Sequence, residues 1–383
     1  MRTQRIVSVG VVVAGLLAAP VPAQAGESWV PVEPAFTFGP NREFVDVEGT
    51  GDGGAWAVGF QREKYSSIPG ATPGSPETVL IDIPPKPLLQ RFDGSSWKNF
   101  TTPGLTGEGA LQDVDAVSPT DVWVSGYHHT DKRRGTTYLA HWNGGKWTKV
   151  TTPNAAETVS ARSLSVDTGG VWLAEGGKVS RLKDGAWTIH DLGMDVYDLR
   201  SYPSGEAWAM GTPLVKHFDG TAWKTVDLPP GHAYKGFRPT GPNTGWITTT
   251  NGLALWDGSA WTTVPYPAGY RNSSYPSAEV GGPWLSTYRG LLHWDGSAWQ
   301  ELPSDAMPQV QDAQGRIWGT DSQSGASGAP ASHAYLLDDG VWKQEYLYPP
   351  LSWSTRLTVL PNGLLYTGEN KDKNLKSFVT TFR

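Results

Sequence analysis

The most chemically distinctive stretch of the sequence is HHTDKRR, residues 128–134. His128, His129 and Asp131 are residue types that ligate transition metals. The basic side chains that follow, Arg133 among them, could instead receive an acidic partner. Adjacent histidines diverge in an extended chain. The sequence therefore favours a solvated basic loop over a metal site, and it predicts no metal and no other cofactor.

Two aromatic clusters offer a different chemistry. The segment PYPAGYRNSSYP supplies Tyr266, Tyr270 and Arg271, and the segment YLYPPLSW supplies Tyr346, Tyr348 and Trp353. Aromatic faces stack on the apolar surfaces of sugars or peptides, while polar neighbours orient the ligand. The same rings could instead pack the loops onto the fold, and both interpretations stay open. Trp353 is the strongest binding candidate, because it has no place in the repeat described below.

Local signatures of catalysis are missing. The sequence contains no Ser-His-Asp arrangement, no HExxH motif, no phosphate-binding glycine loop and no evident carboxylate pair. It has no cysteine, which excludes thiol and metal-thiolate chemistry. A site assembled from distant parts of the chain leaves no local motif. The sequence therefore favours binding over catalysis without deciding between them.

A repeat determines which elements must position these residues. The repeated motif is an apolar residue, then Asp-Gly or Asn-Gly, then one or two further residues and a Trp. It occurs seven times. The Trp residues of the copies are Trp97, Trp147, Trp187, Trp223, Trp261, Trp299 and Trp342. Successive copies are 50, 40, 36, 38, 38 and 43 residues apart, which is the length of a four-stranded propeller blade and too long for a leucine-rich repeat.

A second Trp follows a polar turn in each unit. These residues are Trp56, Trp123, Trp172, Trp208, Trp246, Trp284 and Trp318. In an eighth unit, NGLLYTG, Leu365 or Tyr366 takes the place of the Trp. Each unit reads as four antiparallel strands, here called a to d in chain order, with the Asp-Gly turn between strands c and d.

The two ends of the chain complete each other. The segment GESWVPVEP matches a strand d that has no strands a to c before it, and the last unit stops where its strand d should begin. We expect the strand of Trp29 to complete the last blade and so remove the open sheet edges. The sequence predicts an all-β fold, a single β-propeller of eight four-stranded blades, with seven as the alternative if one unit is irregular.

The repeated phrase resembles the repeats of secreted actinobacterial β-propeller proteins and, more distantly, the kelch repeat. The resemblance covers the chain after residue 25 and implies a propeller fold, which hosts hydrolases, lyases, oxidases, lectins and scaffolds. Sialidase-like propellers use three arginines around a carboxylate. Four arginines fall in predicted inner strands: Arg162, Arg200, Arg238 and Arg356. A solvated lining of the central channel is the favoured interpretation of these residues.

The repeat also assigns the two faces of the ring. The a–b and c–d turns are short and uniform and share one face, here called the turn face. The b–c and d–a connections share the other, here called the loop face, and carry the insertions, such as the Pro-, Gly- and Ser-rich segment 60–86, which we expect to form a flap or arm. Binding residues concentrate in variable loops on a rigid scaffold. The candidates for function are therefore the residues that do not repeat.

The first 25 residues read as a secretory signal peptide, with Arg2 and Arg5, an apolar run over 6–19 and the sequence Ala23-Gln24-Ala25. We expect cleavage, a propeller domain over 26–383, an extracellular location and no membrane anchor, because the apolar run is too short for a stable span. Removing Arg2 and Arg5 changes the formal charge from −6 to −8. This mildly acidic balance argues against nucleic acid as a partner.

The predicted function is a secreted propeller that binds an extracellular glycan or protein on its loop face. The alternative is an extracellular glycan hydrolase or lyase with its site at the loop-side mouth of the channel.

Overall fold

The computed structural model describes residues 29–32, 35, 43–62, 64–68, 78–130, 133–154, 161–211, 214–229, 237–249, 251–270, 275–278, 280, 282–287, 290–302, 306–321, 333–338, 340–346, 353–361, 363–370 and 375–382. Within these ranges every regular element is a β-strand. No helix long and apolar enough to cross a membrane is found in the part of the chain that is described.

The strands form eight four-stranded sheets, here called blades. Blade 1 contains β2 (Glu43–Gly49), β3 (Ala55–Gln61), β6 (Lys86–Phe92) and β7 (Trp97–Asn99). Blade 2 contains β8 (Gly109–Ser118), β9 (Asp121–Thr130), β10 (Arg133–Trp142) and β11 (Trp147–Lys149). Blade 3 contains β12 (Ser163–Asp167), β13 (Gly170–Glu175), β14 (Lys178–Lys183) and β15 (Ala186–Asp191). Blade 4 contains β16 (Val196–Ser201), β17 (Ala207–Gly211), β18 (Val215–Phe218) and β19 (Trp223–Thr225).

The second half of the chain repeats this arrangement. Blade 5 contains β20 (Phe237–Gly241), β21 (Thr244–Thr248), β22 (Gly252–Trp256) and β23 (Trp261–Pro265). Blade 6 contains β24 (Tyr275–Ala278), β25 (Trp284–Thr287), β26 (Gly290–Trp294) and β27 (Trp299–Leu302). Blade 7 contains β28 (Ala306–Gln311), β29 (Ile317–Asp321), β30 (His333–Asp338) and β31 (Val341–Tyr346). Blade 8 contains β32 (Trp353–Leu360), β33 (Gly363–Asn370), β34 (Leu375–Phe382) and, as its fourth strand, β1 (Trp29–Val32).

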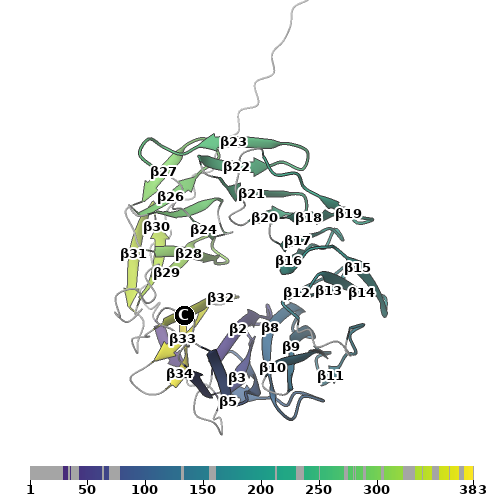
Figure 1. Ribbon diagram of the computed structural model, residues 1–383. Coiled ribbons are helices and arrows are strands. Elements are labelled where there is room, and N and C mark those ends of the chain that lie inside the picture. The colour runs from purple at the N-terminus through teal and green to yellow at the C-terminus, as the bar shows by residue number, and fades with distance from the viewer. Residues whose placement is uncertain are drawn as a thin grey trace, which may run out of the picture.

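The blades form a ring around a central opening, with the first strand of each blade innermost (Figure 1). The N-terminal strand β1 pairs antiparallel with β34, in a register that sets Trp29 opposite Phe382. The fold is therefore an eight-bladed β-propeller. The prediction of eight blades, with the last one completed by the N-terminal strand, is confirmed.

The Trp of strand b supplies the contact between successive blades. Six of these side chains are at most 1% exposed: Trp56, Trp172, Trp208, Trp246, Trp284 and Trp318. Eight buried apolar clusters join one blade to the next, and we call each packed boundary a seam, named by its two blades. In seam 8–1 the position is taken by Leu365, which is fully buried against blade 1. This settles the choice between Leu365 and Tyr366.

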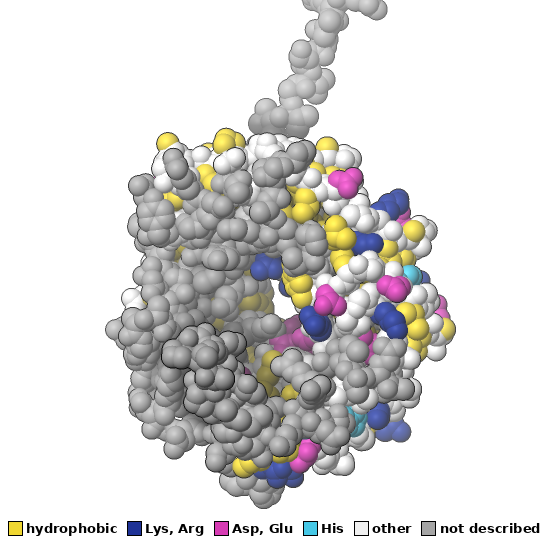
Figure 2. Space-filling model, in the orientation of Figure 1, with side chains coloured by type: hydrophobic (Ala, Val, Ile, Leu, Met, Phe, Trp, Pro, Cys, Tyr) yellow, Lys and Arg dark blue, Asp and Glu magenta, His cyan; other side chains and the backbone are white. Residues whose placement is uncertain are grey.

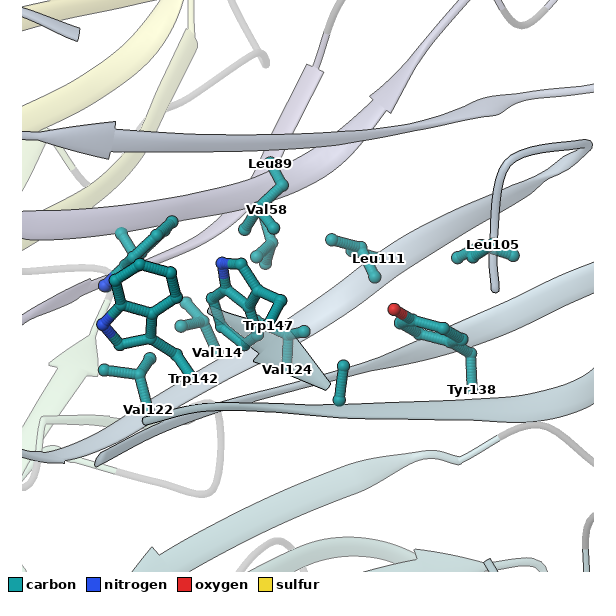
Figure 3. Packing of buried hydrophobic residues seen from close by; sticks show 12 residues of the cluster. Val58, Leu89, Leu105, Leu111, Val114, Val122, Val124, Tyr138, Trp142 and Trp147 are labelled. Carbon is teal, nitrogen blue, oxygen red and sulfur yellow. The ribbon is translucent and has the colours of Figure 1, made fainter. Parts of the chain in front are cut away.

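Seam 1–2 shows how the aromatic residues meet (Figure 3). The ring of Trp56 from blade 1 lies 5.2 Å from Trp142 and 4.9 Å from Trp147, both of blade 2, in edge-to-face geometry. Such pairs add to the free energy gained by burying the rings. In this seam the strand-b Trp of blade 1 thus contacts both the strand-c and the strand-d Trp of blade 2.

In blades 3, 5 and 6, the Trp of strand d forms a hydrogen bond to the preceding blade. The indole N–H of Trp187 donates to the carbonyl oxygen of Thr151 at 3.0 Å, that of Trp261 to Asp227 at 2.8 Å and that of Trp299 to Pro265 at 2.9 Å. Each acceptor lies just after strand d of the preceding blade or at its end. The repeated Trp therefore has a structural role at the outer rim of the ring.

The Asp-Gly turns position that Trp. In the copy at 295–299, Asp295 Oδ1 accepts hydrogen bonds from the backbone N–H groups of Ser297 and Ala298, both at 2.8 Å. Gly296 adopts a φ of 98°, which a side chain would strain. The N–H groups of Ala298 and Ser297 lower the pKa of the Asp295 carboxyl. The repeated phrase is a self-contained corner between strands c and d.

The long segment after β3 contains a hairpin, β4 (Lys64–Ile68) and β5 (Thr78–Ile83), which forms a separate two-stranded sheet. It joins strands b and c of blade 1, so it emerges on the loop face. The sequence predicted a flap or arm at this place, and the arm is a β-hairpin.

Replacing a strand-b Trp should open its seam. Trp172→Ala removes a fully buried ring that packs on blade 4, and we expect it to lower the free energy of unfolding by about 3–5 kcal/mol. Ile189→Ala, on the outer strand β15 where 49% of the side chain is exposed, serves as the control and should cost less than about 1 kcal/mol. Urea unfolding followed by circular dichroism measures both; equal losses would contradict the role given to the Trp.

Candidate functional site

The predicted basic loop belongs to a long hairpin of blade 2. His128 and His129 lie near the end of β9, and both are half-buried. The His128 ring packs edge-on against Tyr138 at 5.8 Å, and burial, with a smaller effect of Lys149, lowers its pKa. Arg133 is the first residue of β10 and pairs with Thr130. In the part of the chain that is described, no group of three or more His, Cys, Asp or Glu side chains converges as a metal site requires.

The first aromatic cluster packs into the fold. Tyr270 is 8% exposed and belongs to the cluster of seam 5–6, against which Tyr266 also packs. The Tyr266 hydroxyl donates to the Thr249 carbonyl oxygen at 3.3 Å, and its ring lies 5.9 Å from that of Trp299. Burial raises the pKa of Tyr266 to about 12. These contacts favour the packing interpretation, while ligand binding by either residue stays a prediction.

The second aromatic cluster and Arg271 are described only in part. Trp353 is the first residue of β32 and Tyr346 the last of β31, and only their backbone is described. Arg271 and Tyr348 lie outside the described residues. The backbone of Trp353 pairs with Glu369 near the end of β33, which is the loop-face end of blade 8. Its role in binding stays a prediction.

The inner strands carry acidic side chains that no local sequence motif marks. Asp113 and Asp115 project from β8 and accept hydrogen bonds from the backbone N–H groups of Leu164 at 3.2 Å and Val166 at 2.6 Å, both on the inner strand of blade 3. Asp46 on β2 accepts one from Val114 at 2.9 Å. These carboxylates therefore link successive inner strands around the channel.

Glu48, also on β2, lies among these groups. Burial raises its pKa to about 8, the neighbouring Asp115 adds to the increase and Arg200 opposes it. Burial also raises the pKa values of Asp113 and Asp115 to about 6, against the hydrogen bonds that they accept. A cluster of carboxyls with raised pKa values is a common property of functional sites, although structural networks produce it too. In Figure 2, acidic and basic side chains lie around the central opening.

The arginines predicted to line the channel are distributed as follows. Arg200 lies on β16, with its Nε 3.7 Å from Asp198 Oδ1, Arg238 lies on β20, and Arg356 lies on β32. Arg162 precedes β12 by one residue, so its assignment to the strand was wrong by that margin. Arg200 is 45% exposed in its side chain, which fits a solvated channel lining.

Two cavities lined by described residues lie on the turn face. The larger, of about 520 Å³, is in seam 4–5 and lies between His217 of blade 4 and Trp256 and Trp261 of blade 5. The smaller, of about 310 Å³, is in seam 2–3 and includes His141. The sequence predicted function among the residues that do not repeat, whereas these cavities are built from the repeat.

A sequence signal for these cavities was present in the repeated phrase. Five copies carry a basic residue two or three positions before the Asp or Asn of the turn: Arg91, His141, Arg181, His217 and His293. Each is the cross-strand partner of the strand-b Trp in its own blade. The rings stack closely, with His293 4.0 Å from Trp284 and His141 4.2 Å from Trp123. The basic position therefore covers the strand-b Trp at the seam.

No family model matches the sequence, and no curated protein is detectably similar to it. Among solved structures, the chain is similar to YCF48 bound to D1 peptide, with a TM-score of 0.50 and 14% identity over 93% of this chain and 95% of that chain. It is also similar to the WD40 domain of SCAP from fission yeast, with a TM-score of 0.51 and 10% identity over 93% of this chain and 94% of that chain. At these identities the likeness concerns the propeller fold alone, and the resemblance to kelch and actinobacterial repeats stays a prediction.

The channel carboxyls should make stability depend on pH. The folded protein keeps a proton on Glu48 that the unfolded chain loses above its ordinary pKa of 4.5, so stability falls as the pH rises from 4.5 to about 8. Glu48→Gln removes this effect and should raise the free energy of unfolding at pH 8 by roughly 2–4 kcal/mol, with little change at pH 4.

Urea unfolding at a series of pH values measures this difference. Glu301→Gln, which neutralises an exposed carboxylate on the outer strand β27, is the matched control and should leave the slope unchanged. A Glu48→Gln curve parallel to that of the wild type at every pH would show that Glu48 is ionised in the folded protein at neutral pH.

Proposed function

We propose that the protein is a secreted interaction propeller that binds an extracellular protein or glycan on its loop face. The observation that carries this proposal is the β9–β10 hairpin. Gly109, the first residue of the inner strand β8, pairs with His128. The hairpin pairs His129–Arg134 and Thr130–Arg133 therefore lie beyond the first residue of the inner strand, on the face where the β4–β5 arm also emerges from the neighbouring blade.

The charge of this extension supports an interaction. Its sequence, HTDKRR, concentrates basic residues on a protein whose formal charge is −6. A basic projection on an acidic protein attracts acidic groups of a partner and orients the encounter. The solved YCF48 structure is bound to a D1 peptide, which is a precedent for peptide binding by a ring of this fold.

The location is part of the proposal. The signal peptide predicted over residues 1–25 supports export, and the absence of cysteine leaves stability to the seams rather than to disulfides. A ring stabilised by buried tryptophans fixes the strands from which its connecting loops begin, and a fixed scaffold lowers the entropic cost of binding.

The proposal predicts that loop-face variants lose binding. A variant carrying Trp353→Ala, Arg133→Ser and Arg134→Ser should be retained about five- to tenfold less than the wild type on a panel of polysaccharides, cell-wall fractions and immobilised secreted proteins, equivalent to ~1 kcal/mol or slightly more.

The matched control removes two positive charges from outer strands instead. Lys98→Ser with Lys343→Ser acts on β7 and β31, where both side chains are more than half exposed. This control should bind as the wild type does. Equal retention of the loop-face variant and the wild type, or an equal loss in the control, would exclude the loop face as the binding surface.

The channel carboxyls support an enzymatic alternative, an extracellular glycan hydrolase or lyase. Glu48 lies opposite Trp56, beside the a–b turn, so a site that uses it lies at the turn-face end of the channel and not at the loop-side mouth that the sequence predicted. A carboxyl with a raised pKa near others that stay ionised is the arrangement that general acid catalysis of glycan cleavage uses. Asp113 and Asp115, however, accept backbone hydrogen bonds from blade 3, which gives them a structural role.

A turnover assay decides this alternative. If it holds, new reducing or unsaturated ends appear when the protein is incubated with a glycan panel, and Glu48→Gln abolishes them. A panel without new ends would count against catalysis.

A further inference from the structure

The seam 4–5 cavity combines aromatic walls with fixed polar groups, and we propose that it is a second binding site, for an uncharged pyranose saccharide. It lies on the turn face and does not depend on the function proposed for the loop face. Its volume of about 520 Å³ is within the range of small-molecule sites, ~300–1,000 Å³.

The wall from blade 5 is aromatic. Trp256 and Trp261 lie 5.3 Å apart with their planes at 51°, so their faces form a corner. The Trp261 indole N–H donates to the Asp227 carbonyl oxygen at 2.8 Å, which fixes that ring in place. Indole faces stack on the C–H face of a pyranose.

The wall from blade 4 is polar and held in place. His217 Nε2 donates to the Pro242 carbonyl oxygen at 2.8 Å and lies 3.6 Å from Glu206 Oε1. Ser204 Oγ donates to the other Glu206 oxygen at 2.9 Å. A carboxylate that is already held by hydrogen bonds loses little conformational entropy when it accepts a hydrogen bond from a ligand hydroxyl group.

The Asp-Gly turn of blade 4 adds a second acceptor. Asp219 Oδ1 accepts hydrogen bonds from the Thr221 hydroxyl at 2.6 Å and from the Ala222 N–H at 3.0 Å, and Lys224 lies 2.6 Å from Oδ2. Lys224 and these donors lower the pKa of Asp219, so the group stays ionised in mildly acidic medium. The turn that forms the corner of the blade therefore also lines the cavity.

The charge of the lining selects the ligand class. The lining contains three carboxylates, of Glu206, Asp219 and Asp227, and one ammonium group, of Lys224. This excess of negative charge disfavours uronic acids and other anions. The pairing of aromatic faces with several hydroxyl acceptors fits a neutral sugar.

Two other seams, 2–3 and 5–6, each lack one of these two walls. In seam 2–3, the smaller cavity has His141 but meets Leu182 and the turn that follows it in place of two indoles. In seam 5–6, Trp294 and Trp299 form the same indole pair, 5.5 Å apart, but Leu255 stands at the position of His217. Of these three seams, only seam 4–5 brings both walls together.

Calorimetric titration of the full chain with cellobiose, N,N′-diacetylchitobiose, mannobiose and digalacturonate tests the proposal. We expect one neutral disaccharide to bind at one site, and no binding of digalacturonate. Glu206→Gln, which preserves shape, should weaken that binding at least about tenfold, and Trp256→Leu should do the same.

Trp294→Leu changes the equivalent ring of seam 5–6 and should leave the dissociation constant unchanged, as should the loop-face variant described above. Glu206→Gln keeps the test independent of any folding defect in Trp256→Leu. Absence of binding by all three neutral sugars, binding of digalacturonate alone, or binding that Glu206→Gln leaves intact would each overturn the proposal. Loss of binding in the loop-face variant would assign the sugar to the other face.

Discussion

Everything in this fold depends on a Trp that its own sheet cannot bury. The strand-b Trp projects from one face of its four-stranded sheet and is fully buried only when the next blade covers it. Trp172, for example, is buried against blade 4. A single blade would leave an indole of this size in water. Burial of the ring and its edge-to-face contacts therefore make each blade require a successor. A series of such sheets has no satisfactory end except a closed ring.

The same requirement explains how the repeat is divided between structure and function. Strands b, c and d form the seam. They supply the buried Trp, in five blades a basic residue that covers it, and in three blades a Trp that donates a hydrogen bond to the preceding blade. The inner strands are linked by polar contacts instead, such as Asp46 to Val114 and Thr358 to the Val47 carbonyl oxygen. What remains variable is the loop face and the identity of the few side chains that line each seam.

The sequence predicted the ring because each of its signals is local. An Asp-Gly turn needs only neighbouring residues, and a regular spacing of Trp residues reports the blade length directly. The last unit was ambiguous, because Leu365 and Tyr366 are both apolar and only the strand register shows which one faces blade 1. Arg162 was assigned to a strand that begins one residue later, an error of the size expected where a loop enters a sheet.

The candidate sites were harder to predict. Glu48, Asp115 and Arg200 belong to three different blades, and no local pattern reports that the ring brings them together. The seam 4–5 cavity is hard to predict for another reason: its residues are part of the repeat, and repetition by itself indicates a structural role. His217 has this double character, since it covers Trp208 at 4.4 Å and also faces the cavity.

The way the ring closes has a mechanical consequence. Trp29, the first residue of β1, lies opposite Phe382, the last residue of β34. The chain therefore enters β1 and leaves β34 at the same end of this antiparallel pair. A force that separates the two chain ends would load the hydrogen bonds between these strands one after another, as in opening a zipper, and not all together in shear. The ring is thus held by eight seams against thermal opening but is weak to tension applied at its termini, where the four residue pairs of this ladder give way in turn.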